Sequence, residues 1–252
     1  EMRQGARLVT KLWNAARLIA GIENEKLKVE NARASNSQLL PSDRALLSWL
    51  QRLIGRATAS FQSYEYAAAS EATERFFWST LCDNYLEWVK GRLYDGSEQE
   101  RNAAQATLYH TLLTILKLLA PILPHITEEI YQQLYGSAIE PDEAAAAFHS
   151  IHTSAWPQAN PALLDEPAEQ VGAALLAITG GVRRFKSARK LGLGAALTSL
   201  AIAVENEGVR HALDQSSADI RSVTRAREIT FAAQPDEQFE EIEPGLWIVI
   251  TE

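Results

Sequence analysis

The sequence lacks several features that would place it in common functional classes. It has one cysteine in 252 residues, Cys82, so we expect neither an intrachain disulfide framework nor a cysteine-based zinc site. A single thiol is also typical of a reducing, cytoplasmic compartment. No uninterrupted apolar run is long enough to span a bilayer, so we expect no contact with membranes. No glycine-rich loop follows a predicted strand, which argues against a nucleotide-binding turn.

Cations are in the minority, because 24 Lys and Arg residues stand against 32 Asp and Glu residues and the net charge is -8. This balance argues against a protein that coats nucleic acid indiscriminately, but it allows a local basic face. The first 20 residues hold four bases and one acid, and residues 171–204 hold five bases and no acid. The cations are therefore concentrated in two segments.

Hydrophobic periodicity predicts a mainly α fold in three parts. An antiparallel helical bundle is expected over residues 1–140, an acidic connector over 141–165 and a small α+β domain over 166–252. The bundle helices are expected over residues 3–20, 42–60 (with Ser42 as N-cap), 64–93, 98–120 and 124–136. The second part is expected to hold helices over residues 169–190, 207–215 and 218–225, and strands over 197–204, 228–232 and 246–250.

The first predicted helix separates its cations from its apolar residues. At 100° per residue, its cations and one amide fall within an arc of roughly 120°, opposite the apolar residues. The members of this stripe are Arg3, Arg7, Lys11, Asn14 and Arg17. Cations beside an amide suit contacts with phosphates and base edges. A solvated helix face is the alternative interpretation of the same stripe.

A second basic cluster ends the helix predicted over residues 169–190. Arg183, Lys186 and Lys190 are expected to be exposed beside its buried stripe. Cations in a last turn also complement the helix dipole, so phosphate contact and dipole stabilisation both remain open. Asp83 and Glu87 share one helical face, without a third group that would suggest catalysis. We expect no metal site.

Three strings resemble one protein family. They are Lys-Leu-Trp-Asn at residues 11–14, Trp-x-x-x-Cys-Asp-x-Tyr-Leu-Glu at 78–87 and Pro-x-x-Pro-His at 121–125. Together they resemble the anticodon-binding domain of class I aminoacyl-tRNA synthetases. The last string is shared with leucyl and isoleucyl enzymes, whereas the first two are similar to the valyl-tRNA synthetase branch. The catalytic signatures of that family, His-Ile-Gly-His and Lys-Met-Ser-Lys-Ser, are absent.

The resemblance implies a segment that binds the anticodon stem-loop of a valine tRNA and supports aminoacylation. The parent valine–tRNA ligase would use ATP and magnesium, whereas this segment would hold no cofactor and no catalytic residue. Its partners would be tRNA and the catalytic and editing domains of the parent. The residues expected to bind tRNA are Arg3, Arg7, Lys11, Asn14, Arg17, Arg183, Lys186 and Lys190.

Two alternatives remain open at this point. One is the same domain from an isoleucyl or leucyl enzyme. The other is a synthetase-derived helical module that binds protein and no RNA.

Overall fold

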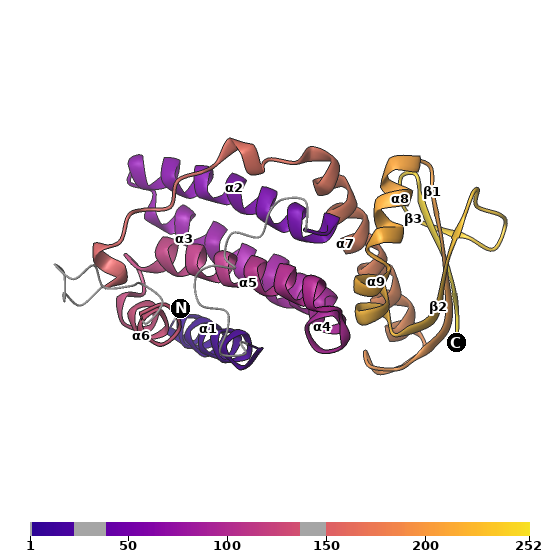
Figure 1. The fold of residues 1–252 in the computed structure, drawn as a ribbon, viewed down its shortest axis with the longest axis horizontal. Coiled ribbons are helices and arrows are strands. Elements are labelled where there is room, and N and C mark those ends of the chain that lie inside the picture. Colours follow the sequence, from indigo (N-terminus) through magenta and orange to yellow (C-terminus); the bar gives the residue numbers. More distant parts are fainter. Residues whose placement is uncertain (1, 23–38, 137–149) are drawn as a thin grey trace.

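The computed structural model describes residues 2–22, 39–136 and 150–252 (Figure 1). Its first part is a helical bundle and its second part is a four-stranded sheet covered by helices on one face. Within the described ranges every strand follows residue 195, as the periodicity predicts. The fold class is therefore confirmed.

The bundle is built from long helices, and within residues 41–119 short turns join antiparallel helical segments. Its elements are α1 (Met2–Ile22), α2 (Pro41–Gln62), α3 (Tyr66–Arg75), η3 (Phe76–Tyr85), α4 (Leu86–Asp95), α5 (Glu98–Leu119) and α6 (Pro124–Leu134). Ser97 caps α5 by accepting a hydrogen bond from the Glu100 amide, and the Glu100 side chain accepts one from the Ser97 amide. Pro121 follows the end of α5, because proline cannot continue a helix.

The start of α2 differs from the prediction. Its N-cap is Leu40 rather than Ser42, and the Asp43 carboxylate accepts a hydrogen bond from the Leu40 amide at 3.0 Å. Proline is favoured in the first turn of a helix, so Pro41 moves the start upstream of Ser42. The Ser42 hydroxyl instead donates to Asp219 at 2.5 Å, far along the chain.

The predicted continuous helix over residues 64–93 is also wrong in its middle. Residues 76–85 form the π-helix η3, which separates α3 from α4. The side-chain amide of Asn84 also donates to the main-chain carbonyl of Ser79, at 2.7 Å. Apolar spacing does not distinguish α from π backbone over such a short segment. π segments are frequent at functional sites.

After the turns η4 (Ile151–Thr153) and η5 (Pro161–Leu163), helix α7 (Glu166–Ala188) packs against both α2 and the sheet. Gly172 permits the close approach to α2, because a Cβ there would lie 2.5 Å from Cη2 of Trp49. Gly181 permits the approach to the sheet, because a Cβ there would lie 2.8 Å from Cδ1 of Ile248. The predicted bounds of α7 are correct to within three residues.

The sheet has the strand order β2-β1-β4-β3. β1 (Leu197–Val204) is parallel to β2 (Ala226–Ala232) and antiparallel to β4 (Leu246–Thr251), which also pairs with β3 (Glu240–Glu243). Helices α7, α8 (Glu207–Gln215) and α9 (Ser217–Thr224) cover the face that is turned toward the bundle (Figure 1). Strand β3 was not predicted, because three of its four residues are glutamates.

One hydrophobic core runs through both parts. A buried ionic cluster, which we call the Arg92 cluster, crosses the same junction and consists of Ser42, Asp43, Tyr85, Arg92 and Asp219. The guanidinium of Arg92 lies 2.6 Å from Asp43 Oδ1 and 2.7 Å from Asp219 Oδ1. These contacts connect α4 with the first turn of α2 and with α9.

Candidate tRNA interface

Helix α1 is oriented in the bundle as its sequence predicts. Leu8, Leu12 and Ile19 are buried, whereas Arg7 and Arg17 are exposed. Asn14 is exposed between the two cations along the helix. Arg3 belongs to α1, but its side chain lies outside the described part. The predicted separation of the apolar and basic faces is thus confirmed over residues 7–19.

Lys11 differs from the other members of the stripe because it turns toward η3. Its Nζ lies 3.8 Å from Oδ1 of Asp83 and 5.1 Å from the ring centroid of Trp78. Its side chain is 36% exposed, and that of Asp83 is 55% exposed. The cation therefore remains accessible to solvent while it is held over η3.

Arg183 on α7 reaches the same end of η3. Its Nη2 donates to the main-chain carbonyl of Asp83 at 2.5 Å, and its Nη1 donates to Oδ1 of Asn84 at 3.2 Å. The two basic clusters, which are about 170 residues apart in the sequence, therefore meet at Asp83. Lys190 is exposed just beyond α7, where it has a left-handed backbone with φ of 59°.

Lys186 is a correction to the predicted interface, because it is 1% exposed rather than on the surface. Its Nζ donates to the carbonyls of Leu193, Ala195 and Thr224 at 2.7 to 2.9 Å. Burial, and secondarily the charge of Arg225, lowers the pKa of Lys186. This side chain holds the loop that follows α7 against α9, and its three donors are occupied.

A cavity of about 510 Å³ opens where these residues meet. We call it the junction cavity, and its lining residues come from α1, η3, α4, α7, α9 and the loop before β1. It is lined by Lys11, Cys82, Asp83, Glu87, Val182, Arg183, Lys186, Leu193, Gly194, Ser222, Val223 and Arg225. Burial raises the pKa of Cys82 to about 12, so its thiol is not poised as a nucleophile.

Comparison with known proteins places the chain in a family. The family described as the anticodon-binding domain of tRNA ligase matches residues 43–202, which run from the first turn of α2 into β1. The chain belongs to this family. Within the anticodon-binding domain, the match includes η3 and α7, the elements that bring Asp83 and Arg183 together.

Curated relatives extend the similarity over most of the chain. The valine–tRNA ligase of Methanopyrus kandleri is 36% identical over 90% of this chain and 24% of its own length. The enzyme of Rickettsia felis is 38% identical over 93% of this chain and 26% of its own length. The enzyme of Methanothermobacter thermautotrophicus is 38% identical over 82% of this chain. The resemblance to the valyl branch is confirmed, and the chain spans about a quarter of the length of these relatives.

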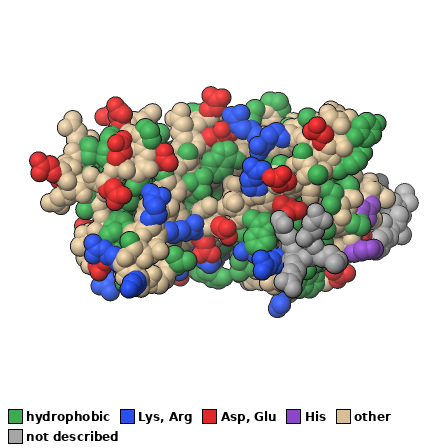
Figure 2. Space-filling view, turned by 180° about the vertical axis from the view of Figure 1, so that it is seen from behind, with side chains coloured by type: hydrophobic (Ala, Val, Ile, Leu, Met, Phe, Trp, Pro, Cys, Tyr) green, Lys and Arg blue, Asp and Glu red, His purple; other side chains and the backbone are tan. Residues whose placement is uncertain are grey.

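On the face of the molecule that Figure 2 draws, the basic side chains do not form one continuous surface. Figure 2 shows separate groups of Lys and Arg side chains with Asp and Glu side chains between them. Such a surface suits an ordered set of phosphate contacts better than indiscriminate electrostatic binding.

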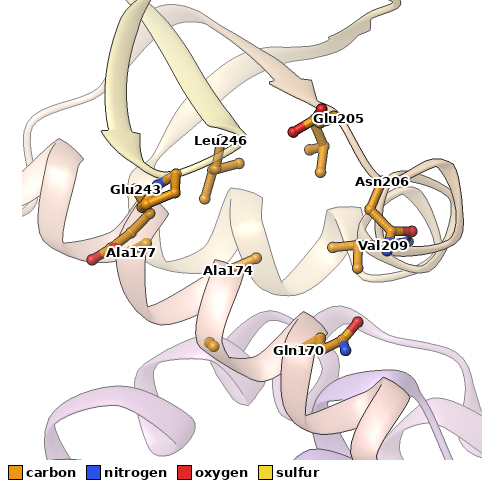
Figure 3. A pocket seen from close by; sticks show the side chains of 12 residues that line it. Gln170, Ala174, Ala177, Glu205, Asn206, Val209, Glu243 and Leu246 are labelled. Atoms are coloured by element: carbon orange, nitrogen blue, oxygen red, sulfur yellow. Dashed lines mark hydrogen bonds between the residues drawn. The ribbon is translucent and has the colours of Figure 1, made fainter.

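A second cavity, of about 830 Å³, has a different character. It lies between α7, the start of α8 and the β3–β4 turn, where Val209 and Leu246 point into it above Ala174 (Figure 3). Glu205 and Glu243 are its charged residues, and no Lys or Arg lines it. This cavity is therefore unsuited to the phosphates of a nucleic acid.

The described residues contain no cluster of metal-ligating side chains and no helix that could span a membrane. They contain no group of three or more His, Cys, Asp or Glu side chains arranged to hold an ion. The sequence has two closely spaced histidines, His149 and His152. His152 contacts the carbonyl of Pro124 through Nε2, and His149 lies outside the described residues. Among the described helices, none combines the length and apolar character needed to cross a bilayer.

The sequence analysis assigned no role to three residues of the cavity wall. Asp83 and Glu87 were noted on one helical face, but the cation that contacts Asp83, Lys11, comes from another element. Arg225 ends α9 in a left-handed conformation with φ of 60°, and no pattern singles it out. The string that contains Asp83 indicated the family. It did not predict that Asp83 contacts Lys11 and Arg183.

Proposed function

We propose that this anticodon-binding domain binds the anticodon stem-loop of a valine tRNA, as part of a valine–tRNA ligase that acts in the cytoplasm. The observation that carries the proposal is the exposed polar face of α1, with Arg7, Asn14 and Arg17 in line and Lys11 beside them. Membership of the anticodon-binding family and the valine–tRNA ligases among its relatives support it.

The residues have different roles in this proposal. Arg7, Lys11 and Arg17 neutralise phosphates, and Asn14 contacts a base edge, because an amide both donates and accepts hydrogen bonds. Arg183 on α7 and Lys190 just after its end provide further phosphate contacts. Lys186 is not included, because its three donors are occupied by carbonyls. The side chain of Arg3, on the same arc of α1, remains a candidate.

The chemistry of the parent enzyme lies outside this segment in our proposal. Ligation of valine to tRNA through ATP and magnesium, with the editing of errors, would be carried out by the catalytic and editing domains. We expect the 252-residue chain alone to be inactive in valine-dependent exchange of pyrophosphate into ATP. Exchange above the level of a protein-free control would contradict this assignment.

The test of tRNA binding is a salt titration of the affinity of the chain for a valine tRNA transcript. Each cation on a phosphate contributes about one unit or less to the slope of log K against log salt, so the Lys11→Ala/Arg17→Ala double variant should flatten the slope by about one to two units. Asn14→Ala should leave the slope unchanged and reduce the preference for valine tRNA over other tRNAs by about 1–3 kcal/mol.

The matched control removes the same charge from another face. Arg56→Ala/Arg75→Ala changes two exposed cations on α2 and α3 and should retain the slope of the original chain. Circular dichroism verifies that every variant is folded. If the α1 variants remain folded and bind tRNA with an unchanged slope and affinity, the basic stripe is only a solvated face.

A further inference from the structure

The basic side chains of the junction cavity differ in how strongly other groups of the protein already hold them. The cavity has four basic and two acidic side chains in its wall. Lys186 is committed to carbonyls, and Glu87 is paired with Lys90 at 2.6 Å. Arg225 is exposed, and its guanidinium has no hydrogen bond or ion pair among the described residues. The cavity therefore has an unpaired cation on the α9 side and the weakly paired Lys11 on the α1 side.

Resting on the proposed function, we propose that the junction cavity binds one phosphodiester of the tRNA backbone between Lys11 and Arg225, and that Asp83 holds Lys11 until the phosphate displaces it. Arg183, which also lines the cavity, is a further donor. Its guanidinium has five N–H groups, and two hydrogen bonds to η3 fix its position. The cavity volume of about 510 Å³ lies in the range of small-ligand sites.

The contact between Lys11 and Asp83 has the geometry of an exchangeable pair. At 3.8 Å the two atoms are too far apart for a hydrogen bond, and both side chains are in contact with water. Exposed pairs of this kind contribute little to stability, so a phosphate can replace the carboxylate at small cost. A phosphate oxygen also forms stronger, charge-assisted hydrogen bonds with an ammonium group.

The anchoring of Arg183 differs because it does not depend on the Asp83 charge. Nη2 of Arg183 donates to the main-chain carbonyl of Asp83, which remains in any variant of that side chain. Neutralising Asp83 therefore frees Lys11 and removes a charge that repels phosphate, while Arg183 stays in place. Asp83 in this view competes with the backbone phosphate for Lys11 and so lowers the affinity for tRNA.

The experiment measures the affinity of the 252-residue chain for a labelled valine tRNA transcript by fluorescence anisotropy, first at one fixed salt concentration and then over a salt series. Asp83→Asn should bind about 3- to 10-fold more tightly, because the removed carboxylate lies within a few ångströms of the phosphate site. Arg225→Ala should bind more weakly and reduce the salt slope by about one unit. In the Lys11→Ala background, the gain from Asp83→Asn should be smaller, since there is no lysine to release and only the removed repulsion between carboxylate and phosphate remains.

Asp214→Asn is the matched control, because it makes the same charge change at an exposed position on α8 outside the cavity. Its affinity should match that of the original chain, and thermal unfolding verifies that all variants are folded. An Asp83→Asn affinity that is unchanged or weaker, or an equal gain in Asp214→Asn, overturns the inference. If the inference is overturned in this way while the original chain still shows salt-dependent binding that the α1 variants reduce, only the cavity assignment fails. If the original chain does not bind tRNA, the proposed function fails with it.

Discussion

Two sets of charged side chains join the bundle to the α+β part, and they differ in their access to water. In the Arg92 cluster, the side chains of Arg92, Asp43 and Asp219 are all 0% exposed. At the junction cavity, Lys11 and Asp83 are 36% and 55% exposed. Basic side chains paired with aspartates therefore form a buried clamp in the Arg92 cluster and a solvent-accessible pair at the junction cavity.

The difference follows from the cost of removing charge from water. Burial, and secondarily the carboxylate of Asp43, raises the pKa of Tyr85 well above its usual value, and burial likewise raises the pKa of Asp219. In such surroundings each carboxylate requires Arg92 as its partner, so the contacts cannot be exchanged for a ligand. Water screens the Lys11–Asp83 pair, which leaves Lys11 available for a phosphate.

The strongest test of the clamp is Arg92→Met. This variant leaves two buried carboxylates without their cation, and we expect a loss of about 3–5 kcal/mol in the free energy of unfolding. Chemical denaturation measures the change. The control is Arg75→Met, which removes an exposed i,i+4 pair with Glu71 and should cost at most about 0.5 kcal/mol. If both variants lost a similar free energy of unfolding, burial would not explain the difference between the two sets of ion pairs.

A second contrast between buried and exposed sites is offered by two helical glycines. Gly172→Ala places a methyl group against Trp49 and should destabilise the chain by about 1–3 kcal/mol through overpacking. Gly55→Ala meets no atom within 4 Å on α2 and should stabilise the chain by about 0.5–1 kcal/mol. Thermal unfolding of the two variants should therefore shift in opposite directions. A stabilising Gly172→Ala would mean that α7 can move away from α2.

Two lysines near the end of α7 separate structure from binding. Lys186→Met removes the donor shared by three carbonyls, and we expect a loss of about 1–3 kcal/mol in the free energy of unfolding. Lys190→Met alters an exposed side chain and should change stability by less than about 0.5 kcal/mol. Denaturant titration compares them. If Lys186→Met were as stable as Lys190→Met, the carbonyl contacts would contribute nothing measurable.

A small stability effect is also expected at the junction cavity. Lys11→Ala should change the free energy of unfolding by less than about 1 kcal/mol, because its partner Asp83 is more than half exposed. The same variant should weaken tRNA binding, so stability and affinity would be affected separately. A loss comparable to that of Arg92→Met would instead place Lys11 among the structural contacts.

Local patterns were sufficient to predict much of the fold and one face of the site. The apolar spacing of α1 determined which side is buried, because every residue of a helix has a fixed angle around its axis. Ser97 and Glu100 determined the start of α5 through a reciprocal cap that needs only neighbouring residues. The change of periodicity after the connector predicted β1 with its bounds correct, whereas β2 begins two residues before its predicted start and β3 was missed. The division into domains at residues 141–165 remains a prediction.

Contacts between residues distant in the sequence were decided only by the tertiary structure. Lys186 has the sequence surroundings of a surface lysine, yet the loop before β1 and the end of α9 enclose it with carbonyls. Asp219 and Arg92 lie 127 residues apart, and nothing local pairs them. Asp83 acquires Lys11 and Arg183 in the same way. The physical reason is that periodicity determines which face of an element is buried, whereas the groups that meet that face depend on how all the elements pack together.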